Sequence, residues 1–175
     1  MRVSRKQVEE NKQTILTAAG RLFRERGFDA VTVTDIMKSA GLTHGGFYGY
    51  FKSKDDLIAQ TLAELKIEND AAKNDVVAQI ERYLSPEHRD NFASGCPLAA
   101  LAAETIRQSE PARDEMSARL QQQIAQLSEA MDDRDAQASR RAAIGSWSAM
   151  VGALILARMT ADSAFSDEIL GETAA

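Results

Sequence analysis

The stretch from His44 to Lys54 holds the residues whose types and spacing best fit one chemistry, contact with a nucleic-acid backbone. Tyrosine hydroxyls and lysine ammonium groups commonly contact phosphates. Glycines remove side-chain bulk, so that a backbone can come close to DNA. The alternative is a plain helical hairpin without a ligand. The side chains and glycines predicted to face outward are His44, Gly45, Gly46, Tyr48, Tyr50, Lys52 and Lys54.

Two short helices are predicted to position this stretch. Thr32 can cap the first helix, with Asp35 three residues later completing a capping box, and Gly41 can end it in left-handed backbone. Thr43 can cap the second helix. The order of helix, glycine turn and helix is the layout of a helix-turn-helix, whose second helix presents its N-terminal residues to the DNA major groove. The inward-facing residues are predicted to be Val33, Ile36, Met37, Ala40, Leu42, Phe47 and Phe51.

Helices are also predicted on both sides of the motif. The first runs from Gln7 to Arg26 and stops at Gly27. The second begins after Ser53, with Asp56 forming another capping box, and is expected to continue to about Ala72. The basic segment 1–6 could reach a minor groove, or it could be a disordered start. The predicted apolar stripe of the first helix is Val8, Ile15, Ala18, Ala19, Leu22 and Phe23.

The same residues resemble the DNA-binding domain of the tetracycline-repressor (TetR/AcrR) family. The resemblance runs from about Val8 to Leu62 and is carried by Thr32-Val33-x-x-Ile36, Ala40-Gly41-Leu42-Thr43, Gly45-x-Phe47-Tyr48-x-Tyr50-Phe51 and Lys52-Ser53-Lys54-Asp55-Asp56-Leu57. It implies an all-α fold, with an N-terminal three-helix DNA-binding domain over residues 1–54. A helical effector-binding and dimerisation domain is then expected over residues 55–175.

The resemblance also implies roles for single residues. Those at phosphate-contacting positions are Thr32, Thr34, Tyr48, Tyr50 and Lys54; those facing the groove are Thr43, His44, Gly45 and Gly46. Two glycines depart from the family pattern: Gly46 has no side chain to reach a base, and Gly49 stands where an aromatic residue is common. Recognition is therefore expected to depend on His44, Thr43, the backbone and DNA shape.

Composition and charge agree with a DNA-binding head on a different body. The chain has a net charge of −5, but residues 1–54 carry +5 and residues 55–175 carry −10. This asymmetry is typical of a nucleic-acid-binding module joined to another function. Three prolines and many helix-forming residues favour an all-α fold. A single cysteine and no signal-peptide pattern indicate a cytoplasmic location.

The C-terminal part is predicted to be a helical body. Helices are expected over residues 75–84, 96–109, 110–131, 142–157 and 166–173, the last capped by Ser166, with a loop over 85–95. The resemblance implies a pocket for a small-molecule effector that the sequence does not identify. Large, adaptable apolar side chains are typical of pocket walls, although the same residues could be ordinary core. The candidate pocket residues are Phe92, Leu101, Met116, Leu120, Trp147 and Met150.

Residues 142–157 contain no charged side chain. This run is too short for a membrane span, so no membrane partner is expected. A helix that is apolar all round must be covered on several sides. Small residues would let a second copy of the chain approach, which predicts a two-fold homodimer. The predicted interface residues are Gly145, Ala149, Gly152 and Ala153.

Cys96 is a possible sensor of oxidants or electrophiles. It begins a predicted helix, where a thiolate is stabilised and therefore more reactive. The Gly95-Cys96 start also resembles a branch of the family that senses such compounds, whereas a lone cysteine is often a plain buried residue. An enzyme is the competing class, and a Cys96–His88 pair could form in space. However, no metal-ligand spacing or phosphate-binding glycine loop supports an enzyme, and no cofactor is expected.

The prediction is thus a DNA-binding transcriptional regulator, most simply a repressor. We expect it to bind a near-palindromic double-stranded operator as a homodimer and to be released by a small molecule or by modification of Cys96. A third possibility is an interaction module whose head no longer binds DNA, which Gly46 and Gly49 keep open.

Overall fold

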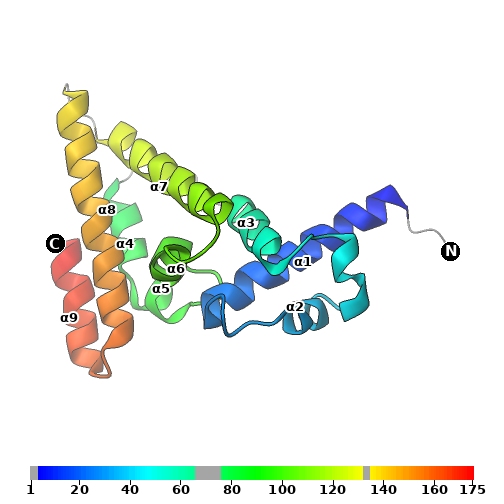
Figure 1. Cartoon of the computed structure of the whole chain (residues 1–175). Coiled ribbons are helices and arrows are strands. Elements are labelled where there is room, and N and C mark those ends of the chain that lie inside the picture. Colours follow the sequence, from blue (N-terminus) through cyan, green and yellow to red (C-terminus); the bar gives the residue numbers. More distant parts are fainter. Residues whose placement is uncertain (1–3, 66–75, 132–134) are drawn as a thin grey trace. The chain divides into compact units, whose positions relative to one another are not determined.

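The computed structural model describes residues 4–65, 76–131 and 135–175 (Figure 1). Helices are the only regular secondary structure in these ranges, which confirms the predicted all-α class. The chain forms two compact units. Among the described residues, the first unit holds 4–65 and 100–116, and the second holds 76–99, 117–131 and 135–175.

The first unit is built on a long helix, α1 (Arg5–Arg26), which packs against α2 (Val33–Ser39) and α3 (Lys54–Glu64). The short 3₁₀ helix η1 (His44–Gly49) packs against α2. Most of α6 (Pro97–Thr105) and the start of α7 (Glu110–Ala130) also belong to this unit. Its core includes Ile15, Phe23, Phe28, Ile36, Met37, Phe47, Phe51, Leu57 and Leu62.

The boundaries of α1 follow from its ends. Ser4 caps the helix by accepting a hydrogen bond from the Gln7 amide (3.1 Å). Gly27 ends it with φ of 81°, which confirms the predicted stop. The predicted inward position of Val8 is wrong, because Val8 is 40% exposed and all of residues 4–10 are exposed.

Helix α3 is shorter than predicted. The Ser53 hydroxyl accepts from the Asp56 amide (3.1 Å), which confirms the predicted cap. The Asp56 carboxylate accepts from the amide of Lys52 (2.8 Å) rather than that of Ser53, so the reciprocal bond falls one residue earlier. The helix ends at Glu64 because Leu65 is extended. The rest of the stretch expected to reach Ala72 lies outside the described residues.

The second unit contains α4 (Val76–Tyr83), α5 (Pro86–Asp90), α8 (Ala136–Met159) and α9 (Ser163–Ala174), with parts of α6 and α7. Helix α8 packs against α9 and α5. Helix α5 lies where a loop was predicted, because the Ser85 hydroxyl caps it by accepting from the His88 amide (3.1 Å).

Three other boundaries or orientations in the second half also differ from the prediction. Helix α9 begins earlier, since Asp162 rather than Ser166 caps it. Helix α6 ends at Thr105, which leaves Ile106 72% exposed although an inward position was predicted. In α7, Leu120 is 38% exposed, and Arg119 one residue earlier is buried in its place.

Helix α8 is longer than the uncharged run that predicted it. By length and composition alone it is the one helix in the described ranges that could cross a membrane, with 33% of its most apolar window buried. Core helices of soluble proteins pass the same test, so this is weak support for a span. The predicted limit at residues 142–157 was too short, because the helix also includes flanking arginines such as Arg141 and Arg158.

Candidate nucleic-acid interface and effector region

The start of α2 is fixed by a complete capping box. The Thr32 hydroxyl accepts from the Asp35 amide (3.1 Å), and the Asp35 carboxylate accepts from the Thr32 amide (3.0 Å). These bonds to Thr32, first from its hydroxyl and then from its amide, hold the pKa of Asp35 below its ordinary value. The predicted cap is confirmed, and both residues lie within one helical turn in the sequence.

The turn after α2 also follows the sequence. Gly41 has φ of 71°, a left-handed backbone that glycine adopts readily. Its amide donates to the Lys38 carbonyl (3.1 Å), and the Leu42 amide donates to the Met37 carbonyl (2.9 Å). This pair of bonds is a Schellman motif. Leu42 is half-buried, so it covers the core only in part.

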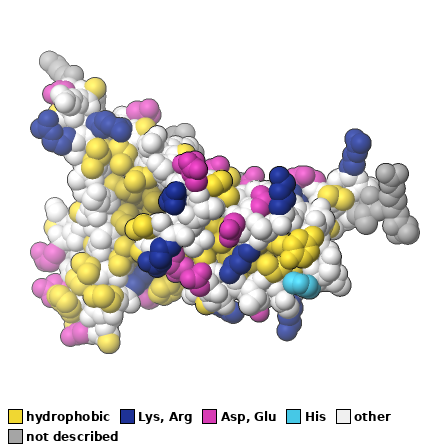
Figure 2. All heavy atoms as spheres, in the orientation of Figure 1, with side chains coloured by type: hydrophobic (Ala, Val, Ile, Leu, Met, Phe, Trp, Pro, Cys, Tyr) yellow, Lys and Arg dark blue, Asp and Glu magenta, His cyan; other side chains and the backbone are white. Residues whose placement is uncertain are grey.

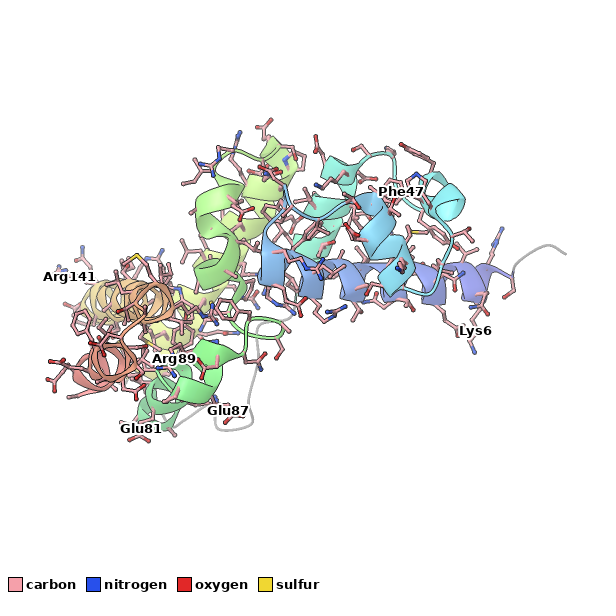
Figure 3. The ribbon with its side chains drawn as sticks, turned by 90° about the horizontal axis from the view of Figure 1, so that it is seen from below. Lys6, Phe47, Glu81, Glu87, Arg89 and Arg141 are labelled. Carbon is pink, nitrogen blue, oxygen red and sulfur yellow. The ribbon has the colours of Figure 1, made fainter. Side chains whose placement is uncertain are left out.

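The second motif helix, η1, is a 3₁₀ helix. Thr43 occupies the cap position in extended backbone, but its side chain makes no capping hydrogen bond, contrary to the prediction. Three glycines in six residues explain the weak helix, since glycine disfavours the α conformation. Phe47 anchors the segment because it is 1% exposed and stacks on Phe51 with centroids 5.6 Å apart. Figure 3 shows Phe47 on this segment.

The residues around η1 form one exposed surface, which we call the reading face: Thr34, Thr43, His44, Gly45 and Tyr48. Tyr48 is 74% exposed. The Thr34 hydroxyl and His44 Nδ1 are 3.2 Å apart and link α2 to η1. A Cβ added at Gly45 or Gly49 would meet no atom within 4 Å. These glycines are therefore not required by packing within the chain.

Four further residues that were predicted to face DNA lie outside the reading face: Gly46, Tyr50, Lys52 and Lys54. Gly46 is half-buried, and the Lys52 side chain is exposed. The Tyr50 hydroxyl accepts from the Asn11 side-chain amide (2.9 Å), a contact that the sequence analysis missed. Lys54 Nζ donates to the backbone carbonyl of Phe28. Tyr50 and Lys54 thus have partners inside the chain at the atoms predicted to contact phosphate.

In the second unit, Cys96 lies in a cluster of aromatic and polar side chains. The Cys96 amide donates to His88 Nε2 (3.0 Å), and His88 Nδ1 lies 2.7 Å from the Tyr83 carbonyl. Because a carbonyl only accepts and an amide only donates, His88 carries its proton on Nδ1. The His88–Cys96 pair that the sequence left open does form, through the backbone amide of Cys96. The Tyr83 ring packs on His88 and, at 5.0 Å, on Trp147.

The electrostatics of this cluster involve the Cys96 thiol. Burial, and then the neighbouring Cys96, raise the pKa of the Tyr83 hydroxyl. Burial lowers the pKa of Arg158, an effect opposed by Cys96, Tyr83 and Asp90. The Tyr83 hydroxyl and Trp147 Nε1 are buried without a hydrogen-bond partner of ordinary geometry in the described part of the chain. We call Tyr83, His88, Cys96, Trp147 and Arg158 the Cys96 cluster.

The predicted pocket residues divide between the two units. Leu101 and Met116 belong to the first unit; Phe92, Leu120, Trp147 and Met150 belong to the second. Trp147 and Met150 are buried. Phe92 is 43% exposed and lies under the Arg158 guanidinium, 4.5 Å from its ring centre. A pocket formed by these residues stays a prediction.

Helices α8 and α9 carry an exposed apolar surface, part of which is visible in Figure 2. Gly145 and Ala149 are exposed, and Gly152 is half-buried with open space at its Cβ position. Ala153 instead is 5% exposed and packs within its own chain. The sequence analysis missed the exposed large residues of this surface, although a helical projection would have shown them: Ile144, Ile155, Leu156, Met159 and Phe165.

Two family models match this chain. "Bacterial regulatory proteins, tetR family" matches residues 15–61, which include the motif. "Transcriptional regulator LmrA/YxaF-like, C-terminal domain" matches residues 71–169, more than half of the chain.

Individual proteins are also similar. HbdR, an HTH-type transcriptional regulator of Aromatoleum sp. (strain CIB), is 34% identical over 84 residues, covering 48% of this chain but only 35% of HbdR. The Escherichia coli (strain K12) repressor NemR is 28% identical over 136 residues, which cover 71% of this chain and 68% of NemR. The crystal structure of reduced E. coli NemR matches with a TM-score of 0.75 and 22% identity, over 94% of this chain and 93% of that one. The last comparison supports the fold, and the two family models show that the chain belongs to the TetR family of transcriptional regulators, with an LmrA/YxaF-like C-terminal domain.

Proposed function

We propose that this chain is a cytoplasmic transcriptional repressor. It binds a near-palindromic operator as a homodimer and is released by a small-molecule effector or by modification of Cys96. The observation that carries the proposal is the reading face, where η1 presents exposed polar residues and open glycines on a capped α2 and an aromatic anchor. This is the arrangement by which a helix-turn-helix enters the major groove.

Selection of genomic DNA fragments on the purified protein, followed by a salt titration, tests DNA binding. An enriched near-palindrome and a steep negative slope of log affinity against log salt are expected. Because Lys52 is exposed beside the reading face and a homodimer carries two copies of it, Lys52→Met should make that slope shallower by about 1.8, or about 0.9 for each protomer. Arg82→Met removes the same charge from an exposed site on α4, away from the proposed dimer face, and should leave the slope unchanged. Binding without sequence preference would instead support a degenerate head.

The proposal for Cys96 rests on its surroundings. The thiol lies beside Arg158 and the Tyr83 hydroxyl, and Cys96 is only half-buried. Because Cys96 is not fully buried, a reagent can reach its sulfur. N-ethylmaleimide, to which the thiolate adds as a thioether, should label the native protein once and weaken operator binding. Cys96→Ser should keep operator binding and lose the response. A native protein that stays unlabelled in intact-mass spectra would contradict this part of the proposal.

The exposed surface of α8 and α9 supports the homodimer. Gly145, Ala149, Gly152 and Leu156 follow one another at spacings of three or four residues, so they share one face of α8. Sedimentation velocity should show a dimer for the wild type and for Val77→Glu, which changes an exposed residue of α4. Leu156→Glu should give a monomer, because it places a charge in the interface. A monomeric wild type at micromolar concentration would argue against this interface.

An enzyme remains the competing class for the Cys96 cluster. Across residues 4–65, 76–131 and 135–175, no group of three or more His, Cys, Asp or Glu is arranged to hold a metal ion. His88 Nε2 accepts from a backbone amide, so it is occupied rather than directed at the sulfur as a base. The geometry therefore favours a sensing role for Cys96 over nucleophilic catalysis.

A further inference from the structure

Both backbone polar groups of Phe28 are held by charged side chains. Phe28 is fully buried and packs edge-on against Phe23, with ring centroids 5.1 Å apart. Its amide donates to Glu104 Oε2 (2.7 Å), and its carbonyl accepts from Lys54 Nζ. Glu104 lies 76 residues away in sequence, on the part of α6 that belongs to the first unit. A carboxylate and an ammonium thus hold the two sides of one residue.

Gly27 makes room for this arrangement. Its φ of 81° sets the direction in which the chain leaves α1. A Cβ on Gly27 would lie 2.3 Å from Glu104 Oε1, closer than side-chain carbons come to other atoms. The position favours glycine because of its left-handed backbone, and any larger residue there would also displace the Glu104 carboxylate from its present place.

We propose that Glu104 and Lys54 form a clamp on Phe28 that fixes the connection between α1 and α2, and that both are positioning residues for DNA binding. The connection ends at Thr32, where α2 begins, and Val31 in it is fully buried. Any change in the path from Phe28 to Thr32 would therefore move α2 and the reading face that α2 supports. The consequence for DNA rests on the proposed function, whereas the clamp itself does not.

The sign of the charge separates this role from a simple electrostatic one. Glu104 is negative in a unit that must approach phosphates, so its removal should tighten DNA binding if only charge mattered. A clamp predicts the opposite. For Lys54, loss of a phosphate contact in each protomer of the dimer would reduce the salt slope by about 1.8, whereas loss of a clamp would weaken binding without changing the slope.

The test combines backbone amide exchange with DNA binding on the full chain. In Glu104→Ala, peptides covering residues 27–37 should exchange about tenfold faster, because a hydrogen bond to a charged acceptor is lost. Glu104→Gln should restore most of the protection, since its amide oxygen can still accept. Glu64→Ala removes the same charge from an exposed site on α3 and serves as the matched control. Circular dichroism checks that each variant retains its helices.

The DNA measurements use the enriched operator fragment. Glu104→Ala should bind it about tenfold more weakly, Glu104→Gln within about threefold of the wild type, and Glu64→Ala equally or more tightly. Lys54→Met should bind more weakly with an unchanged salt slope. Unaltered exchange over residues 27–37 in Glu104→Ala would overturn the clamp even if DNA binding is confirmed. A wild type that binds no operator would refute the proposed function, while the exchange result would still decide the clamp.

Discussion

The helix starts of the motif and the helices of the second unit are held in different ways. The starts of α2 and α3 are fixed by residues close in sequence: Thr32 pairs with Asp35, and Ser53 with Asp56. Helices α5, α8 and α9 of the second unit are instead joined to one another by charged side chains. Arg89 on α5 donates to Asp167 on α9 (2.6 Å), and the Arg158 guanidinium donates to the carbonyls of His88 and Arg89. Figure 3 shows Arg89 among these helices.

This difference matters for how each unit can work. A surface that must match DNA benefits from local caps, because they fix helix ends independently of distant packing. Under the proposed function, the second unit responds to an effector. Hydrogen bonds between distant helices suit that role, since a ligand shifts an equilibrium only through contacts that differ between the two states. The Cys96 cluster, with the buried Tyr83 hydroxyl and Trp147 Nε1, includes Arg158, which makes such hydrogen bonds between helices.

The largest expected effect is loss of the aromatic anchor under the reading face. Phe47→Ala should lower the free energy of unfolding by about 3–5 kcal/mol, because a fully buried ring is removed from a packed core. Phe165→Ala, which changes a ring that is 51% exposed on α9, should cost less than about 0.5 kcal/mol when measured in the Leu156→Glu background, which is expected to be monomeric. Urea unfolding followed by circular dichroism gives both values. Equal losses in the free energy of unfolding would contradict the description of Phe47 as a packed anchor and Phe165 as an exposed residue.

The second effect tests the long-range ties. Arg158→Met should destabilise the protein by about 2–3 kcal/mol, since it removes charged donors from half-buried carbonyls and the stacking on Phe92. Arg141→Met, on the exposed surface of the same helix, should change stability by less than about 0.5 kcal/mol. Amide exchange should rise in α5 for the Arg158 variant only. An Arg158 variant as stable as the Arg141 variant would show that this tie contributes little.

The third effect tests the local caps. Thr32→Ala should cost about 1 kcal/mol by removing the N-cap of α2, and Thr32→Ser should restore most of it, because serine also caps. Exchange should rise at the start of α2 while α8 and α9 are unaffected. Faster exchange in α8 and α9 would show that the Thr32 cap also stabilises distant helices, contrary to the local role described here.

A smaller effect, of opposite sign on stability and binding, is expected at the open glycines. Gly45→Ala meets no steric obstacle and should stabilise the protein by about 0.4–1 kcal/mol, because alanine loses less entropy on folding. If the backbone at Gly45 approaches DNA, the same variant should bind the operator more weakly. Gly49→Ala serves as the control for both measurements, since an added Cβ at Gly49 also has open space around it. A Gly45 variant that is more stable and binds DNA as well as the wild type would remove the proposed role of that glycine.

The smallest effect is the pH dependence of the capping box. The pKa of Asp35 is below its ordinary value of 3.8 because the charged carboxylate is bonded to Thr32. The stabilisation is therefore present above pH 3.8 and is lost as the pH falls through the lower pKa of the folded state. Asp35→Asn should flatten the acid side of a plot of melting temperature against pH, while Asp56, whose pKa is also lowered, keeps part of the slope. An unchanged profile would mean that the Asp35 bonds do not contribute.

The sequence by itself determined the elements whose causes are local. The cap at Thr32, the left-handed turn at Gly41 and the inward positions of Phe47 and Phe51 follow from residues within a few positions of one another, and the structure has them as predicted. The motif can therefore be recognised from the order and spacing of its residues. The 3₁₀ form of η1 was less evident, although its glycines are the signal for it.

Tertiary structure alone decided the contacts between residues far apart in sequence. Nothing in the spacing of Glu104 places its carboxylate on the amide of Phe28, and nothing near Arg158 indicates that it holds the carbonyls of α5. Tyr50 and Lys54 likewise acquired partners on other elements of their unit. Such contacts depend on how helices pack, which follows from the shape of the whole core, whereas caps and turns depend on backbone groups that adjacent residues can reach.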